Sequence, residues 1–213
     1  MTDPSVDPAL VLAWLTARSV ARELPAPIHD RGGFRVDTNS EKETRRWVFP
    51  SLSDGLGAIG REVSAPRHFL KLCGSDDELR NALPSNWQIQ PTSYFMRAGV
   101  TSAHAPPLPD GYQVECRHTG PITHVRIIAP DSSLAASGYA AETADAFVYD
   151  RIVTSPAHGR KGLGTAVMFA LGAARRSQTA PHLLVATDAG RKLYTTLGWT
   201  VLSPYATATI LEV

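Results

Sequence analysis

The sequence predicts an α+β fold, an α/β sandwich in which a mixed, mostly antiparallel central sheet is flanked by helices. Apolar and polar residues alternate over residues 112–117, as in a half-buried strand. A glycine-bearing turn joins a strand to a helix over residues 152–165. Three prolines and a glycine in residues 105–111 break the chain. With 213 residues, the chain can form one large domain or two small lobes that share a core.

Composition excludes several classes of protein. Hydrophobic residues make up 43% and charged residues 19%, which is ordinary for a globular protein. The net charge of +1 gives no overall field that would attract nucleic acid, and no apolar run reaches membrane-spanning length. Cys73 and Cys116 lack the spacing of a zinc site and are expected to be reduced, buried thiols. We therefore expect a cytoplasmic protein with no metal and no nucleic-acid or membrane partner, because the N-terminus also lacks a signal-peptide pattern.

The proline-rich segment divides the chain into an N-terminal α/β lobe, residues 1–104, a linker, residues 105–111, and a C-terminal domain, residues 112–213. In the lobe, Asp7 caps a first helix that the prolines at 25 and 27 end. Leu52, Leu56, Ile59 and Val63 share one face of a second helix. Further along we expect a strand over 69–73, a short helix capped by Asp76, and extended segments over 87–90 and 93–97.

The C-terminal domain begins with an antiparallel meander. Its strands are expected over residues 112–117, 124–129, 134–142 and 146–154. A helix then runs to about residue 178, a strand covers 182–187, and a short helix covers 189–197, where Gly198 can end it. Two closing strands, 199–202 and 206–211, complete the domain.

The turn after the fourth strand is the part of the sequence that predicts chemistry. Glycines let the backbone approach a ligand closely, and the free N–H groups of a first helical turn favour an anion. Arg160 and Lys161 add full positive charges beside Gly162 and Gly164. The turn therefore suits a phosphate or diphosphate better than a plain strand-to-helix connection.

Two common phosphate motifs are excluded at this turn. A Walker A loop needs a lysine directly before its Ser or Thr, but Gly164 precedes Thr165. A dinucleotide-binding fingerprint needs a third glycine in a parallel unit, whereas this turn follows an antiparallel meander.

The second half of the chain, residues 111–213, resembles the GNAT (GCN5-related N-acetyltransferase) superfamily. Gly162 and Gly164 match the two small positions of the family's Arg/Gln-x-x-Gly-x-Gly/Ala loop, and Val153 and Pro156 fit the approach to it. Leu193-Tyr194 and Leu197-Gly198-Trp199 match its second motif, in the right order and at the usual separation. Gly159 departs from the family, because Arg or Gln is usual there. In the family, two helices normally follow the first strand, but this sequence has no room for them before residue 124. We therefore expect the N-terminal lobe to form the wall of the acceptor pocket. This lobe could itself be a degenerate GNAT-like half.

The resemblance implies an acetyltransferase that uses acetyl-CoA as co-substrate. Backbone groups of Ile152, Val153 and Thr154 would pair with the pantetheine arm. The diphosphate would bind along the loop formed by Gly159, Arg160, Lys161, Gly162, Leu163, Gly164 and Thr165. Tyr194 would protonate the leaving thiolate, since a phenol keeps its proton at neutral pH.

A base would help the acceptor amine to lose its proton, because an alkyl ammonium has a pKa near ~10. Asp150 is the first candidate for this base, and Glu142 and Asp145 are the next candidates. These carboxylates also give a weak indication of a cationic acceptor. His158 is interpreted as an exposed loop residue.

Three readings stay open: transfer to a small-molecule primary amine, transfer to a protein or peptide amine, and acyl-CoA binding without turnover. A small-molecule amine partner is expected first, and a homodimer is compatible with the sequence.

Overall fold

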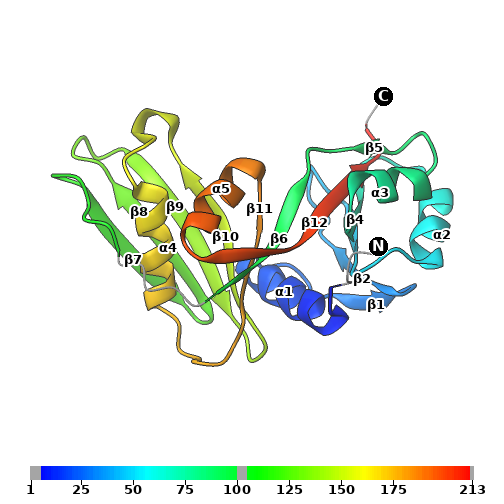
Figure 1. The fold of residues 1–213 in the computed structure, drawn as a ribbon, viewed down its shortest axis with the longest axis horizontal. Helices are drawn as coiled ribbons and strands as arrows, with labels where there is room; N and C mark the ends of the chain where they lie inside the picture. Colours follow the sequence, from blue (N-terminus) through cyan, green and yellow to red (C-terminus); the bar gives the residue numbers. More distant parts are fainter. Residues whose placement is uncertain (1–5, 100–104, 212–213) are drawn as a thin grey trace.

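A single twelve-stranded sheet runs through the protein, which a computed structural model describes for residues 6–99 and 105–211 (Figure 1). The strands are β1 (Ile28–Asp30), β2 (Gly33–Asp37), β3 (Arg45–Phe49), β4 (His68–Cys73), β5 (Gln88–Ile89), β6 (Ser93–Ala98), β7 (Gln113–Thr119), β8 (Ile122–Ile128), β9 (Leu134–Glu142), β10 (Phe147–Thr154), β11 (His182–Ala186) and β12 (Trp199–Thr209). Their order across the sheet is β1-β2-β3-β4-β12-β6-β11-β10-β9-β8-β7, and β5 pairs with β12. All neighbouring pairs are antiparallel except β3 with β4 and β10 with β11. The predicted fold class, a mixed and mostly antiparallel sheet with flanking helices, is confirmed.

Five α-helices and one short 3-10 helix cover the sheet. They are α1 (Pro8–Ala21), α2 (Asp54–Glu62), α3 (Asp76–Ala82), η1 (Pro156–His158), α4 (Leu163–Ala173) and α5 (Asp188–Thr196). α1 begins as predicted, because the Asp7 side chain accepts a hydrogen bond from the Ala9 amide and Pro8 occupies the first helical position. Within the described residues, no helix combines the length and the apolar character that crossing a bilayer requires.

Two strands cross between the halves of the molecule. β6 precedes the proline-rich segment but pairs with β11, which follows it, and β12 from the end of the chain pairs with β4 near its beginning. β6 and β12 also pair with each other. Figure 1 shows both strands running between the two halves through the centre of the molecule. The expected linker, residues 105–111, has neither helix nor strand, and the sheet is continuous across the two parts that it joins.

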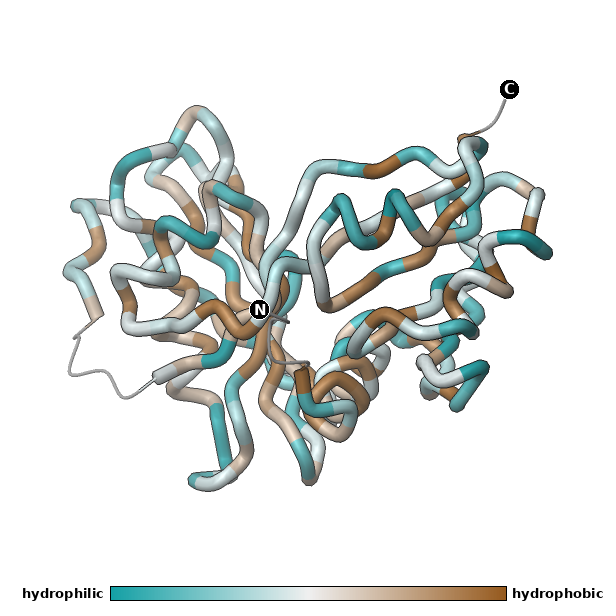
Figure 2. The backbone as a smooth tube through the Cα atoms, turned by 45° about the vertical axis from the view of Figure 1, so that its right-hand side comes forward, coloured by the Kyte–Doolittle hydropathy of each residue, from teal (hydrophilic) through white to brown (hydrophobic). Residues whose placement is uncertain are grey.

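Three hydrophobic clusters fill the layers between sheet and helices. One lies under α4 and includes Phe147 and Leu171, and a second lies under α1 around Trp14 and Phe95. The third packs α2 and α3 against β4 and β12. Figure 2 shows hydrophobic stretches along the strands and helices and hydrophilic residues at many of the outer turns. Burial of these apolar faces is the main stabilising term of the fold.

Several expected elements differ from the structure. Strands β1, β2 and β3 lie in residues 28–49, where none was predicted. The two closing strands are one strand, β12, with a register shift between Val201 and Ser203. α4 ends at Ala173, before the expected residue 178, and Leu52 precedes α2 and is exposed.

Three predicted residue roles are also wrong. The N-cap of α3 is Ser75, which forms a capping box with Glu78, so Asp76 is the first helical residue. β7 is exposed at every position, because it is the edge strand beyond β8 and no helix covers it. Cys73 is buried as expected, but Cys116 on β7 is exposed for the same reason.

Candidate functional site

A cleft opens where the parallel strands β10 and β11 separate. They pair at only two positions, Phe147 with His182 and Val148 with Leu183. Beyond Val148, β10 continues along β9 with a bulge between Asp150 and Val153, while β11 follows β6. A cavity of about 470 Å³ lies at this separation. Two larger hollows, of about 670 and 780 Å³, lie elsewhere on the protein and do not reach the start of α4.

The first turn of α4 presents unpaired backbone N–H groups beside this cleft. Within the described structure, no amide from Arg160 to Thr165 donates a hydrogen bond, and the first that does is Ala166, to the Gly162 carbonyl. No side chain caps the helix either. A row of free amides at a helix N-terminus is an anion-binding arrangement.

Two glycines make this turn possible. Gly162 has a φ of 75°, a left-handed conformation that favours glycine, and it begins the helix there. A Cβ on Gly164 would lie 3.3 Å from Leu193 Cδ2 and 3.5 Å from Thr154 Oγ1. The absence of a side chain at Gly164 therefore keeps the helix start open toward the cleft that it lines.

The basic residues of the loop differ in their partners. Arg160 is exposed, and no partner is found for its guanidinium in the described structure. Lys161 Nζ donates to Tyr112 Oη at 2.8 Å, and Tyr112 Oη lies 2.9 Å from His158 Nδ1. His158 Nε2 lies 3.2 Å from Ser133 Oγ. His158 is thus partly buried and holds the loop to the neighbouring strands, in place of the exposed position that was expected.

The end of β10 lies along the cleft as the sequence predicts. Ile152 and Thr154 line it, and Val153 is 58% exposed. Val153 and Thr154 pair with β9 on one side. On the other side β11 has already diverged, so that edge of β10 faces the cavity instead of another strand.

Tyr194 of α5 lies on the opposite wall. Its side chain is buried but lines the cleft, and its hydroxyl has no hydrogen-bond partner within the described residues. Burial raises the pKa of Tyr194 to about 12, so the phenol is protonated at neutral pH. It can therefore donate a proton to a group in the cleft.

Asp150 also lines the cleft, but arginines occupy its carboxylate. Arg22 donates to both oxygens, at 2.6 and 2.9 Å, and Arg151 lies 3.3 Å away. Burial by itself would raise the pKa of Asp150, but the hydrogen bond from Arg22 and the nearby arginine charges outweigh it and hold that pKa below its usual range. A carboxylate with both oxygens occupied and a lowered pKa is a poor base.

The other two candidate bases, Glu142 and Asp145, lie outside the cleft. Glu142 accepts hydrogen bonds from the backbone amides of Arg176 and Ser177 and so holds the segment after α4. Asp145 lines the 670 Å³ hollow near the start of α1. Neither lines the cleft, so the expected support for a cationic acceptor is missing there.

α1 supplies a wall that residue patterns did not identify. Trp14, Arg18 and Arg22 line the cleft, and their spacing of four places them on one face of the helix. The sequence suggested only that the N-terminal lobe would wall the acceptor side. The i, i+4, i+8 spacing was the available signal, but one aromatic and two basic residues do not form an apolar stripe.

No cluster of three or more His, Cys, Asp or Glu side chains that could hold a metal occurs within residues 6–99 and 105–211. The polar groups of the site include its amides, the phenols of Tyr149 and Tyr194, the Asp150 carboxylate and three arginines.

Comparison with solved structures identifies the fold. A GCN5-related N-acetyltransferase from Kribbella flavida is similar with a TM-score of 0.65 and 13% identity, covering 96% of each chain. A GCN5-related N-acetyltransferase-like protein from Streptococcus suis has a TM-score of 0.59 and 11% identity, over 93% of this chain and 92% of that one. A tandem GNAT protein from the clavulanic acid biosynthesis pathway, solved without AcCoA, has a TM-score of 0.54 and 11% identity, over 100% of this chain and 97% of its own.

The sequence itself matches no protein-family model and no curated protein. The structural similarity shows a GNAT-like fold, and it spans nearly the whole chain. The expectation that the likeness is confined to residues 111–213 is therefore wrong. The first strands, β1 to β3, carry the fold into the N-terminal part but were not apparent from residue patterns.

Proposed function

We propose that this protein is an N-acetyltransferase that transfers an acetyl group from acetyl-CoA to a primary amine of a small molecule. The row of free amides from Arg160 to Thr165, opening into the cleft between β10 and β11, is the observation that carries the proposal. The GNAT-like fold of its structural relatives supports it.

The amide row would hold the diphosphate of the coenzyme. Helix α4 adds the positive end of its dipole, and Arg160 adds a charge without a protein partner in the described structure. Residues 152–154 would pair with the pantetheine arm through the edge of β10 that faces the cavity. This arrangement would direct the thioester toward the bulge in β10 and toward Tyr194.

Transfer would proceed by direct attack of the neutral amine on the thioester carbonyl carbon. The carbon–nitrogen bond forms as the carbon–sulfur bond breaks, and the thiolate takes the proton of Tyr194. The phenol suits this step, since burial keeps it protonated. A backbone N–H on β10, with Val153 as the candidate, would stabilise the oxyanion.

The acceptor ammonium would lose a proton to water before it attacks as the neutral amine, because both oxygens of Asp150 are engaged by Arg22. After attack the nitrogen would release its remaining extra proton to water, and water would return a proton to the Tyr194 phenolate. We propose that Asp150 is a positioning residue that holds Arg22 and, through it, the α1 wall of the cleft.

A thiol-release assay with acetyl-CoA and a panel of amines tests the proposed function. We expect steady CoA release with at least one amine, and a decrease in kcat of about 100-fold in Tyr194→Phe, because a general acid contributes on that order. The affinity for acetyl-CoA should change little, since the ring remains.

Tyr139→Phe is the matched control, because Tyr139 stacks on His124 outside the cleft and its ring is kept. Tight binding of acetyl-CoA without release on any amine would favour the non-catalytic alternative. A kcat for Tyr194→Phe equal to that of Tyr139→Phe would remove Tyr194 from the mechanism.

A further inference from the structure

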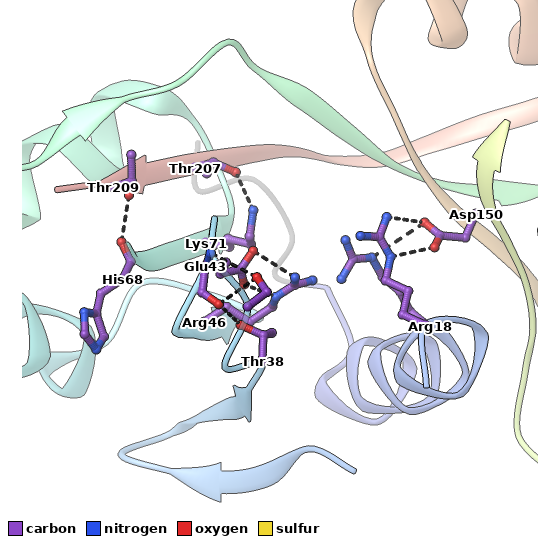
Figure 3. Close-up of polar contacts among 11 residues, drawn as sticks. Arg18, Thr38, Glu43, Arg46, His68, Lys71, Asp150, Thr207 and Thr209 are labelled. Atoms are coloured by element: carbon purple, nitrogen blue, oxygen red, sulfur yellow. Dashed lines mark hydrogen bonds and ion pairs between the residues drawn. The ribbon is translucent and has the colours of Figure 1, made fainter. Parts of the chain in front are cut away.

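The wall that α1 contributes to the cleft is rich in positive charge. Four charged residues line the cavity: Arg18, Arg22, Arg151 and Asp150. Three positive charges and one negative charge leave a net charge of +2 at this end of the cleft. Figure 3 shows Arg18 reaching from α1 toward Asp150 on β10.

Of the three arginines that line the cleft, Arg18 is the one whose guanidinium donates no hydrogen bond within the described structure. Arg22 occupies both oxygens of Asp150, whereas Arg18 Nε lies 3.9 Å from the nearer one, too far for a hydrogen bond. Only 16% of the Arg18 side chain is exposed. A guanidinium that is mostly removed from water and makes no hydrogen bond in the described structure has lost hydration, which the charge of Asp150 at 3.9 Å and the Trp14 ring, whose centroid lies 5.6 Å from Arg18 Cζ, replace only in part.

Trp14, one turn earlier on the same helix face, presents a second unused donor. The residue is 2% exposed, it lines the cleft, and its indole N–H has no hydrogen-bond partner in the described structure. Its ring packs edge-on against Tyr205, whose buried hydroxyl also lacks a partner. Buried polar groups are normally satisfied, but both of these atoms are closed to solvent, so Arg18 is the donor of this wall that a ligand in the cleft can reach.

The surroundings add to the positive potential. Burial and then the charge of Arg22 lower the pKa of Arg18. Burial, followed by the charge of Arg18, lowers the pKa of Lys71 on β4 to about 8. Lys71 lies on the far side of Arg18 from Asp150, where the hydrogen bond found for it within the described residues is to Thr207 at 3.4 Å (Figure 3). The carboxylates of Asp150 and Glu43 raise the pKa of Arg18 and partly offset this repulsion, and an anion in the cleft beside Arg18 would offset it further.

From this geometry we infer that the acceptor amine carries an acidic group, a carboxylate or a phosphate, that binds the Arg18 guanidinium beside Trp14. The inference rests on the proposed function and names its substrate class: small acidic amines such as amino acids. A planar guanidinium fork suits such an oxyanion, because it can donate two parallel hydrogen bonds. The acid would anchor the acceptor at the α1 wall.

Matched acceptors that differ only in this group test the inference. Amino acids would be compared with their carboxamides, and phosphoethanolamine with ethanolamine, by kcat/KM for CoA release at saturating acetyl-CoA. We expect the acidic member of at least one pair to be preferred at least ~10-fold, as a charge-assisted hydrogen bond provides. In Arg18→Gln this ratio should fall to about twofold or less, and Arg18→Lys should retain part of it.

Arg80→Gln is the matched control, since Arg80 is exposed on α3 and far from the cleft residues in the chain. Its selectivity should equal that of the unmodified protein. Calorimetry with acetyl-CoA on each variant checks that the coenzyme site is intact, and melting temperatures check folding. If Arg18→Gln does not fold, Arg18→Lys carries the comparison.

Equal rates for acids and amides, selectivity that is undiminished in Arg18→Gln or, if that variant does not fold, undiminished in Arg18→Lys, or transfer to no acid in the panel would each overturn the inference. Absence of acetyl-CoA binding by the unmodified protein is a different result, because it removes the proposed function itself. The two failures are therefore distinguishable.

Discussion

The same strand–helix–strand unit occurs in both halves of the molecule, but only one copy opens into a cleft. β3, α2 and β4 form the first unit, and β10, α4 and β11 form the second; each joins two parallel strands through one helix. A further helix and a crossing strand follow each unit, β6 after the first and β12 after the second. This repeated order supports our proposal that the N-terminal lobe is a degenerate half of the same fold.

The same three residue types lie at the start of both helices, Gly55-Leu56-Gly57 and Gly162-Leu163-Gly164, and the leucine is buried in both. Gly162 is the N-cap of α4, whereas Gly55 is the second residue of α2. The differences lie around them. β3 and β4 pair at five positions, so they do not splay, whereas β10 and β11 pair at two. The Gly-Leu-Gly motif alone therefore does not make an anion site. The two strands must also separate, and the start of the helix must be left uncovered.

The cover of the first unit is the backbone of the β1–β2 turn. A Cβ on Gly55 would lie 1.8 Å from the Arg31 carbonyl oxygen, whereas a Cβ on Gly162 would meet nothing within 4 Å. α2 also begins with Asp54, which places a negative charge where an incoming phosphate would need a positive one. The first unit is therefore closed by contact and by charge.

Replacing Gly55 or Gly162 with alanine should give the largest difference between the two units, measured as the free energy of unfolding. We expect Gly55→Ala to lower the free energy of unfolding by about 3 kcal/mol, because the new methyl group overlaps backbone that cannot rotate away. Gly162→Ala should cost about 1 kcal/mol, for its positive φ alone. Urea denaturation measures both, and equal costs would contradict the proposed cover over α2.

Replacing the second glycine of each motif with aspartate should weaken acetyl-CoA binding in one unit but not in the other. Gly164→Asp adds a negative charge at the amide row and should weaken acetyl-CoA binding by about 30-fold, roughly 2 kcal/mol. Gly57→Asp makes the same change in the closed unit and should leave that affinity within about twofold. Calorimetry measures both, and a similar loss in the two variants would mean that the coenzyme does not discriminate between the helix starts.

The arginine clamp on Asp150 should be visible in the pH dependence of stability. Since the pKa of Asp150 is lowered in the folded protein, its contribution is fully present above its unfolded value, near 4, and is lost as the pH falls through the folded value. Asp150→Asn should cost about 1–2 kcal/mol at pH 7, a value reduced because Arg22 is 30% exposed. The cost should shrink toward pH 3.

Urea denaturation at pH 7 and pH 3 gives the Asp150 comparison. A cost that stays constant between these two pH values would show that the charge of Asp150 is not what the arginines stabilise.

Local patterns predicted the elements that depend on neighbouring residues. The proline and Asp7 at the start of α1 and the glycine turn before α4 are signals within a few residues, and the structure has both elements in place. Ile152, Thr154, Gly164 and Tyr194, which line the cleft, were named from the resemblance to GNAT motifs, whose residues are also local in the chain.

Features that depend on distant parts of the chain were not predicted. The pairing of β12 with β4 and of β6 with β11 joins residues that are 86 to 140 positions apart, from Arg97 with Leu183 to Phe69 with Thr209, and no local pattern encodes it. The Arg22–Asp150 ion pair spans 128 positions. Without it, Asp150 has the pattern of a free carboxylate on a strand, which is why the sequence favoured it as a base.

Backbone amide resonances recorded during a titration with acetyl-CoA test the central claim most directly. We expect shifts concentrated at residues 159–165 and 152–154, with no comparable change at residues 53–58 of the closed unit. Unchanged amides at 159–165, or shifts centred on the start of α2, would contradict it.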